Sequence, residues 1–213
     1  MKAWEKYNKT TRLIMPNENL VRFIQKTFPD FKKRKKIKIL DAGFASGRHL
    51  VYLAKQGFDV CGFDNSKESL KFAKKWLKKE GLVVKVAKAD MLKLPYKNNS
   101  FDVFIEIGTI EHLFLKDREK AIREAFRVLK PGGQLFLNVK KTGDYLEDSG
   151  KKLEEDTYLI NESFIKNTPY HFFNKKELKG LFKNFRDLDL NYSILTRDNM
   201  SIEIHDWIVV AKK

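Results

Sequence analysis

The stretch Ile37-Lys-Ile-Leu-Asp-Ala-Gly-Phe-Ala-Ser-Gly-Arg-His-Leu-Val-Tyr-Leu53 decides the fold class of this chain. An apolar run ends in Asp41. Small residues follow at Gly43, Ala45 and Gly47, and a helical pattern of apolar residues comes next. This order predicts a strand, a tight turn and a helix. In an open α/β sheet such a turn lies at the carboxyl end of a strand, where small residues let the backbone approach a ligand. The stretch therefore predicts a site for a cofactor that contains adenosine.

The spacing of the small residues separates two kinds of cofactor. The dinucleotide fingerprint G-x-G-x-x-G would put its third glycine at Arg48, which is a bulky cation. The pattern acidic-x-G-x-G-x-G instead fits the run from Asp41 to Gly47, with Ala45 in the middle place. This run resembles the first motif of the class I S-adenosylmethionine-dependent methyltransferases. The resemblance favours S-adenosyl-L-methionine over a nicotinamide dinucleotide.

Two further apolar runs end in acids and are expected to be strands. Residues 59–64 end in Asp64, which lies 23 residues after Asp41. A carboxylate at this place can accept hydrogen bonds from both ribose hydroxyls. Residues 83–90 end in Asp90, whose carboxylate suits the amino group of adenine, a donor. Both acids are therefore candidate cofactor ligands.

The next two motifs extend the resemblance. Phe101 to His112 reads as a fourth strand running into a loop, and Val128 to Val139 as a helix end, a turn and a fifth strand. The series is similar to the small-molecule type of class I methyltransferase, the methyltransferase-11 group, over residues 36–140. The resemblance implies methyl transfer from S-adenosyl-L-methionine to a small molecule, with S-adenosyl-L-homocysteine as product. It also implies a Rossmann-like three-layer α/β sandwich, whose seven-stranded, mostly parallel sheet is closed by an antiparallel C-terminal hairpin.

The motifs supply candidate site residues. Cofactor contacts are expected from Asp41, Gly43, Ala45, Gly47, Arg48, Asp64, Asn65, Asp90, Met91 and Glu106. His112 occupies the position of the family's Glu-His pair, and His171 lies between a long polar segment and the last helix. Either histidine is a candidate base at the acceptor, with a structural role as the alternative. The chain has no Cys-x-x-Cys and no His-x-x-x-His spacing, so we expect no metal site.

Ala45 departs from the family pattern, which usually has glycine at this place. If the backbone needs a positive φ there, alanine costs about 1 kcal/mol. If φ is negative, the methyl group only narrows the space beside the cofactor. Ala45 therefore raises an alternative function, a non-catalytic cofactor-binding partner subunit on the same fold.

We expect a single methyltransferase domain over residues 1–213, in four parts. Residues 1–35 form an N-terminal helical cap, and residues 36–140 form the cofactor-binding core. Residues 141–173 form an insertion or substrate loop, because a polar stretch this long follows the fifth strand. Residues 174–213 form the last helix and the antiparallel hairpin.

Two of these parts are expected to cover the acceptor. Trp4 and Tyr7 in the cap are candidate lid residues, with an ordinary packed helix as the alternative. The insertion is expected to line the acceptor pocket, with a mobile surface loop as the alternative. The acceptor itself and the oligomeric state stay open at this stage.

The charge of the chain allows a second class of acceptor. The net charge is +15, and 34 of the 43 basic residues are lysines. This favours a tRNA or rRNA methyltransferase as the alternative, although arginines and stacking aromatics, which suit nucleic-acid contacts, are not clustered. No apolar run approaches the ~20 residues of a membrane helix, and the N-terminus has no hydrophobic signal region. We therefore expect a cytoplasmic protein with no membrane contact.

Overall fold

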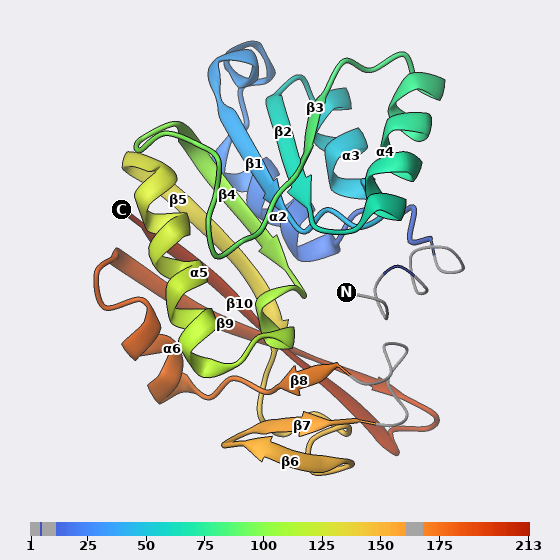
Figure 1. Cartoon of the computed structure of the whole chain (residues 1–213), viewed down its shortest axis with the longest axis vertical. Coiled ribbons are helices and arrows are strands. Elements are labelled where there is room, and N and C mark those ends of the chain that lie inside the picture. Colours follow the sequence, from blue (N-terminus) through green and yellow to red (C-terminus); the bar gives the residue numbers. More distant parts are fainter. Residues whose placement is uncertain (1–4, 6–11, 161–167) are drawn as a thin grey trace.

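The computed structural model describes Glu5, residues 12–160 and residues 168–213. One large sheet runs through it, with strand order β3-β2-β1-β4-β5-β10-β9. The parallel strands are β1 (Lys38–Ala42), β2 (Asp59–Asp64), β3 (Lys85–Lys88), β4 (Phe101–Ile107) and β5 (Leu129–Lys140). The antiparallel strands are β9 (Arg186–Arg197) and β10 (Ile202–Lys212). The expected seven-stranded sheet with a closing antiparallel hairpin is confirmed (Figure 1).

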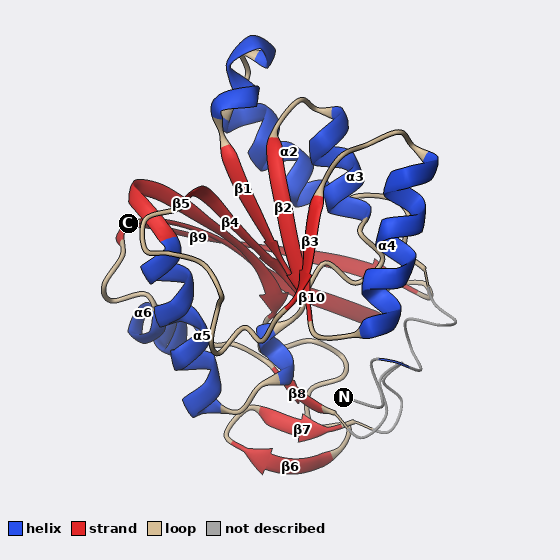
Figure 2. Ribbon diagram, turned by 45° about the horizontal axis from the view of Figure 1, so that its top comes forward, coloured by secondary structure: helices blue, strands red, loops and turns tan. Residues whose placement is uncertain are grey.

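Helices cover both faces of this sheet (Figure 2). They are α2 (Glu18–Thr27), α3 (Arg48–Lys55), α4 (Lys67–Lys79), α5 (Leu115–Val128) and α6 (Lys175–Leu181), with short 3-10 turns η1 (Phe31–Lys36) and η2 (Ile110–His112). The buried side chains of α2, α3 and α4 share one hydrophobic cluster, and those of α5 and α6 share another. The molecule is therefore the expected three-layer sandwich.

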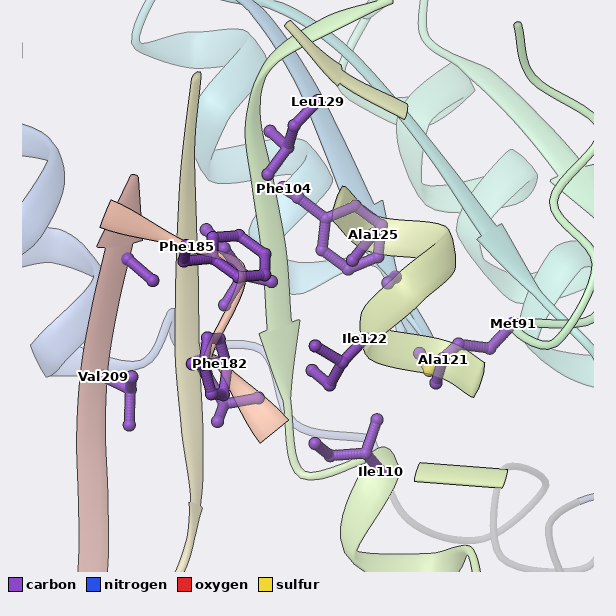
Figure 3. Close-up of a cluster of buried hydrophobic side chains, with 14 of the residues drawn as sticks. Met91, Phe104, Ile110, Ala121, Ile122, Ala125, Leu129, Phe182, Phe185 and Val209 are labelled. Carbon is purple, nitrogen blue, oxygen red and sulfur yellow. The ribbon is translucent and has the colours of Figure 1, made fainter. Parts of the chain in front are cut away.

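The face covered by α5 shows how an apolar stripe fixes a helix. Ala121, Ile122 and Ala125 repeat at helical spacing and are buried. Figure 3 shows them facing the sheet near Phe104, with Phe182 close by. Helix α4 illustrates the polar face of such a helix. Its exposed residues include the lysines at positions 67, 71, 74, 75, 78 and 79. Both faces agree with the helical periodicity of the sequence.

The sheet order creates the crevice in which a ligand would sit. β1 pairs with β2 on one side and with β4 on the other, in both cases parallel. The connections that leave β1 and β4 therefore run in opposite directions across the sheet. Ligands of open α/β sheets bind at such a switch point, beyond the carboxyl ends of the strands.

The described part of the N-terminal cap from residue 12 onward is only partly helical. Residues 12–17 precede α2 without helical structure, and helix α2 begins only at Glu18. The start is fixed by Asn17, whose side chain accepts a hydrogen bond from the Leu20 N–H at 3.1 Å. Trp4 and Tyr7, the candidate lid residues, lie outside the described residues.

The segment expected to be a substrate loop contains a second sheet instead. Its strands are β6 (Lys151–Glu154), β7 (Thr157–Leu159) and β8 (Pro169–His171), all antiparallel. Tyr158 of β7, Tyr170 of β8, and Ile160 and Phe172 just beyond these strands form a small apolar cluster with Leu146. Figure 1 shows this sheet beyond the carboxyl end of β4, with β8 nearest to the large sheet.

The C-terminal part follows the sequence closely. Asn174 caps α6, and its side chain accepts a hydrogen bond from the Glu177 N–H at 2.9 Å. The Glu177 side chain pairs with His171 and Arg118 and so does not hydrogen-bond to the backbone of Asn174.

Within the part of the chain that the structure describes, no helix is long and apolar enough to cross a membrane.

Candidate active site

A cavity of about 290 Å3 lies at the carboxyl ends of β1, β2 and β4. Its walls come from six segments: the stretch before α2, the turn after β1 with the start of α3, the end of β2, the loop after β3, the end of β4 with the loop after it, and β8. The lining residues that the sequence analysis named are Gly43, Ala45, Arg48, Asp64, Asn65, Asp90, Met91 and His112. Asp41, Gly47, Glu106 and His171 do not line it.

The turn after β1 has a left-handed backbone at three places. The φ angles are +69° at Gly43, +48° at Ala45 and +82° at Gly47. A Cβ on Gly43 would collide with the Thr109 side chain, and one on Gly47 would lie 2.9 Å from the Ala73 Cβ. The first of the two alternatives for Ala45 therefore holds, and its methyl group carries the cost of a positive φ.

Asp64 lies at the end of β2 and holds this turn. Its Oδ2 accepts a hydrogen bond from the Ala45 N–H at 2.8 Å, and its Oδ1 accepts one from the Ser66 N–H at 2.8 Å. Burial raises the pKa of the carboxyl above its usual value. Each carboxylate oxygen has a second lone pair, so the group can still accept from a bound hydroxyl.

Asp41 lies behind the turn rather than in the cavity. It is 2% exposed, and burial raises its pKa to about 7. Its Oδ1 is 4.0 Å from Nδ1 of His49, whose pKa is lowered to about 3 by burial. His49 lines the cavity, and its Nε2 accepts a hydrogen bond from the Asn17 N–H at 3.3 Å. Arg48 also lines the cavity and donates to the Met15 carbonyl at 3.0 Å.

The loop after β3 supplies the far end of the cavity. The exposed Asp90 turns this loop, and its Oδ1 accepts a hydrogen bond from the Leu92 N–H at 2.9 Å. Met91 is 7% exposed and adds an apolar surface beside it. An acid next to an apolar wall suits an aromatic base that carries an amino group.

The loop after β4 is shaped by a buried acid. Glu106 is 1% exposed, and its Oε1 accepts hydrogen bonds from the N–H groups of Thr109 at 2.6 Å and Ile110 at 3.0 Å. Its Oε2 is buried without a hydrogen-bond partner among the described residues. Burial raises the pKa of this carboxyl to about 8. Glu106 therefore acts through the loop, and Thr109 and Gly108 of that loop line the cavity.

The remaining wall combines η2 with β8. Glu111 and Tyr170, which the sequence analysis did not select, line it beside His112. The His112 Nδ1 is 2.9 Å from the Pro169 carbonyl, and its ring meets the Tyr170 ring edge-on at 4.8 Å between centroids. Burial lowers the His112 pKa to about 4, so the ring is neutral at physiological pH. The proximity of Glu111 to His112 in sequence was a usable signal, whereas Tyr170 had none.

His171 faces away from the cavity. Its Nδ1 is 2.8 Å from the Thr157 hydroxyl and its Nε2 is 2.7 Å from Glu177 Oε2. The residue is 1% exposed. These contacts join β7, β8 and α6. Within the described ranges, no group of three or more His, Cys, Asp and Glu residues is placed to hold a metal ion.

The turn, the strand-end acids and the cavity fit an adenosine-containing cofactor. The fit rests on the cavity that Gly43 and Ala45 of the turn line and on the acids at the ends of β2 and β3. Comparison with known proteins agrees. Residues 40–137 match the family model described as a methyltransferase domain.

Relatives of known name match over a similar region. Norajmaline N-methyltransferase from Rauvolfia serpentina is 35% identical over 133 residues, which cover 58% of this chain and 45% of the relative. Glycine/sarcosine N-methyltransferase from Halorhodospira halochloris is 33% identical over 136 residues, which cover 62% and 50%. The chain thus spans about half the length of these curated relatives.

A solved structure extends the likeness to most of the fold. The S-adenosylmethionine-dependent methyltransferase from Methanosarcina mazei superposes with a TM-score of 0.71 at 26% identity, covering 83% of this chain and 92% of that one. Motif order, strand order and sequence matches therefore agree. Over residues 40–137 this chain is similar to the methyltransferase domain family, and its fold is similar to that of the S-adenosylmethionine-dependent methyltransferase from Methanosarcina mazei.

Proposed function

We propose that this protein transfers a methyl group from S-adenosyl-L-methionine to a small-molecule acceptor and releases S-adenosyl-L-homocysteine. One observation carries the proposal. The left-handed turn and Asp64 open into the same cavity as Glu111, His112 and Tyr170, which leaves room for an acceptor beside the cofactor site. The names of the two N-methyltransferase relatives support a small molecule as the acceptor.

The cavity residues suggest how the cofactor would be held. The backbone at Gly43 would face the methionine part, Asp64 the ribose and Asp90 the adenine. Arg48 offers a positive charge for the methionine carboxylate. Bound S-adenosyl-L-methionine supplies an activated methyl group, so much of the rate enhancement can come from positioning the acceptor in line with it. The neutral His112 and the acid Glu111 are the groups placed to position an acceptor and to accept its proton.

A ligand titration of the whole chain tests the cofactor. A ligand at 100 times its Kd stabilises a protein by about 2.7 kcal/mol, which corresponds to a rise in Tm of roughly 5–10 °C for a chain of this size. We expect this rise with S-adenosyl-L-methionine and with S-adenosyl-L-homocysteine. NAD should leave the Tm unchanged. A shift with NAD alone, or with none of the three, would contradict the proposal.

Turnover is tested separately, by adding pools of small molecules and measuring S-adenosyl-L-homocysteine. Production above the acceptor-free rate supports catalysis. Cofactor binding without turnover on any pool would favour the non-catalytic partner role instead.

We also infer a cytoplasmic location, supported by the lone cysteine, Cys61, which can form no internal disulfide. Cell fractionation tests this location.

The charge favours a second candidate, an RNA acceptor. The exposed lysines lie on α4. This helix follows Ser66, the neighbour in sequence of the cavity residue Asn65. If RNA binds there, its affinity should fall steeply as salt rises, because phosphate contacts release counterions. Binding of tRNA at 50 mM salt and its loss at 200 mM would support this candidate. Absence of binding at 50 mM salt would reject it.

A further inference from the structure

The acceptor side of the cavity holds one buried acid. Glu111 lies in η2 after β4, and Tyr170 lies opposite it in β8. β1 separates β4 from β2 in the sheet, so Glu111 lies on the other side of the switch point from Asp64. The inference that follows rests on the proposed function, because it concerns the acceptor in that same cavity.

Glu111 is held in place by its neighbours. Its Oε2 accepts a hydrogen bond from the Lys140 N–H at 3.0 Å, and the Tyr170 hydroxyl hydrogen-bonds to the same carboxylate. The residue is 5% exposed. A side chain fixed in this way by a strand on each side can present its charge to the cavity with little loss of entropy on binding.

Lys140, whose positive charge acts on Glu111, is engaged with other acids. The Lys140 ammonium lies 3.1 Å from Asp144 Oδ2 and 3.2 Å from Asp206 Oδ1. The Lys140 ammonium attracts the Glu111 carboxylate only over a longer range. Asp206 counteracts this attraction by repelling the Glu111 carboxylate. Lys140 also lies outside the set of cavity-lining residues. The described residues therefore balance the negative charge of Glu111 only in part.

Among the residues that the structure describes, the wall around Glu111 offers no positive charge to an acceptor. His112 is neutral near pH 7 for the reason given above, and Thr109, Leu113 and Tyr170 carry no positive charge. Among the lining residues that the structure describes, Arg48 is a cation, and its guanidinium binds the Met15 carbonyl on the α3 side of the cavity. An anionic acceptor would thus meet repulsion at Glu111, whereas a cationic one would supply the missing charge.

The aromatic residues of this wall add to the preference. The Tyr170 and His112 rings stand edge to face with centroids 4.8 Å apart, and both residues line the cavity with Glu111. A cation beside an aromatic face gains a further attraction. Leu113 and Leu13 supply apolar surface for the rest of such a molecule.

We propose that the acceptor is a primary or secondary amine with an apolar body, and that Glu111 binds its ammonium form and takes a proton from it. The proton moves from nitrogen to a Glu111 carboxylate oxygen, which leaves a neutral amine. The nitrogen lone pair then forms a bond to the methyl carbon, and the carbon–sulfur bond breaks with its electron pair on sulfur. The product leaves as a methylated ammonium ion, and Glu111 releases its proton to solvent. Burial, which raises the Glu111 pKa to about 7, supports this transfer.

Matched probes test the class of acceptor. Benzylamine, benzyl alcohol and benzoate have nearly the same shape but differ in charge. Each is titrated into the protein saturated with S-adenosyl-L-homocysteine, and its Kd is measured by calorimetry. Benzylamine should bind at least ~10-fold more tightly than the other two, the scale of one charge-assisted hydrogen bond. Equal or tighter binding of benzoate or benzyl alcohol would overturn the proposal.

The variant Glu111→Gln removes the charge but keeps an oxygen that can accept from the Lys140 N–H. It should lose the preference for benzylamine while its Kd for S-adenosyl-L-homocysteine stays within about twofold of the wild type. Glu119→Gln, an exposed acid on α5, is the matched control and should keep the preference. A preference that survives in Glu111→Gln would refute the role of Glu111.

A second variant guards against a fold defect. Tyr170→Phe keeps the ring but removes the hydroxyl that orients Glu111. We expect weaker benzylamine binding by a few-fold, with unchanged cofactor affinity.

In amine turnover, the wild-type rate should rise with pH as Glu111 loses its proton, and this rise should be absent in Glu111→Gln. Failure of the wild type to bind S-adenosyl-L-homocysteine would instead reject the proposed function itself.

Discussion

The Ala45 N–H donates a hydrogen bond to Asp64 Oδ2 at 2.8 Å, so the residue that departs from the family pattern is held by the acid expected to bind the ribose. The contact fixes the left-handed backbone at Ala45, where φ is +48°. The strain of one residue and the position of a cofactor ligand are thus coupled. Substitutions on either side of this hydrogen bond should report on both stability and cofactor affinity.

The first substitution is Ala45→Gly. Glycine relieves the positive-φ strain of roughly 1 kcal/mol, although its freer unfolded chain offsets part of the gain, so we expect a net stabilisation of about 0.5 kcal/mol. This is a rise in Tm of about 1–2 °C, measurable by calorimetry. The backbone N–H remains, so the Kd for S-adenosyl-L-homocysteine should not increase.

The control for this prediction is Ala54→Gly in α3, where the helix favours alanine. That change should lower the stability by about 1 kcal/mol. A fall in Tm for Ala45→Gly comparable to that of the control would show that the left-handed backbone at Ala45 is not strained.

The second prediction concerns the other partner, Asp64. Asp64→Ala removes a carboxylate that would bind two ribose hydroxyls, at roughly 1.5–3 kcal/mol each and partly replaced by water. We expect the cofactor affinity to fall ~10- to 100-fold by isothermal titration calorimetry. The variant should also melt at a lower temperature, because the Ala45 and Ser66 N–H groups lose their acceptor.

Asp59→Asn, at the exposed start of β2, provides the matched control and should change neither quantity. An unchanged Kd in Asp64→Ala would reject Asp64 as a cofactor ligand, whatever happens to the melting temperature.

The positions of the first strands along the chain could be predicted because they depend on local patterns. Apolar runs that end in Asp41, Asp64 and Asp90 mark these strands. Tyr170 could not be predicted as a cavity residue. It reaches Glu111 only because β8 pairs with β7 and packs on η2, which are contacts between distant segments.

The direction of a side chain at the end of a strand could not be predicted from the sequence either. Glu106 and Asp64 both stand at the carboxyl ends of strands, yet Asp64 lines the cavity and Glu106 does not. The difference arises because Glu106 turns back to bind the N–H groups of its own loop. A periodic pattern gives the face of a strand but not the hydrogen-bond partners beyond its end.

The third prediction follows from the buried Glu106. Its folded pKa, about 8, lies above the ordinary value of 4.5, so the folded protein keeps this proton at a pH where the unfolded chain has lost it. The unfolding free energy therefore falls as pH rises between about 4.5 and 8. Glu106→Gln lacks the ionisable group, so the decrease in unfolding free energy that comes from Glu106 is absent in this variant. Relative to the wild type, we expect the unfolding free energy of the variant to increase by about 1–3 kcal/mol between pH 5 and pH 8.

Urea denaturation at several pH values measures this effect. The two buried histidines act in the opposite direction, since the folded pKa values of His49 and His112 are about 3 and 4 and the ordinary value for histidine is 6.5. Their contribution is lost as pH falls below 6.5, in both proteins alike. A difference between the two proteins that does not change with pH would show that Glu106 keeps an ordinary pKa.

The fourth prediction tests what holds the small sheet and α6 to the rest of the molecule. Arg118 of α5 is 2% exposed, donates to the Leu113 carbonyl at 2.6 Å, and lies 3.3 Å from Glu177 Oε1. Arg118→Met leaves the Glu177 carboxylate half-buried with one partner fewer. Breaking such a buried pair costs about 3–5 kcal/mol, and the remaining contact of Glu177 with His171 places our expectation near the lower end, at about 3 kcal/mol.

Two further variants separate the ion pair from helix packing. Arg123→Met on the same helix breaks only an exposed pair with Glu119 and should cost less than about 1 kcal/mol. The double variant Arg118→Met with Glu177→Gln should recover part of the loss, because no uncompensated charge is left buried. If the double variant is as unstable as the sum of the single ones, Arg118 stabilises this region through its hydrogen bond to Leu113 and not through the charge of Glu177.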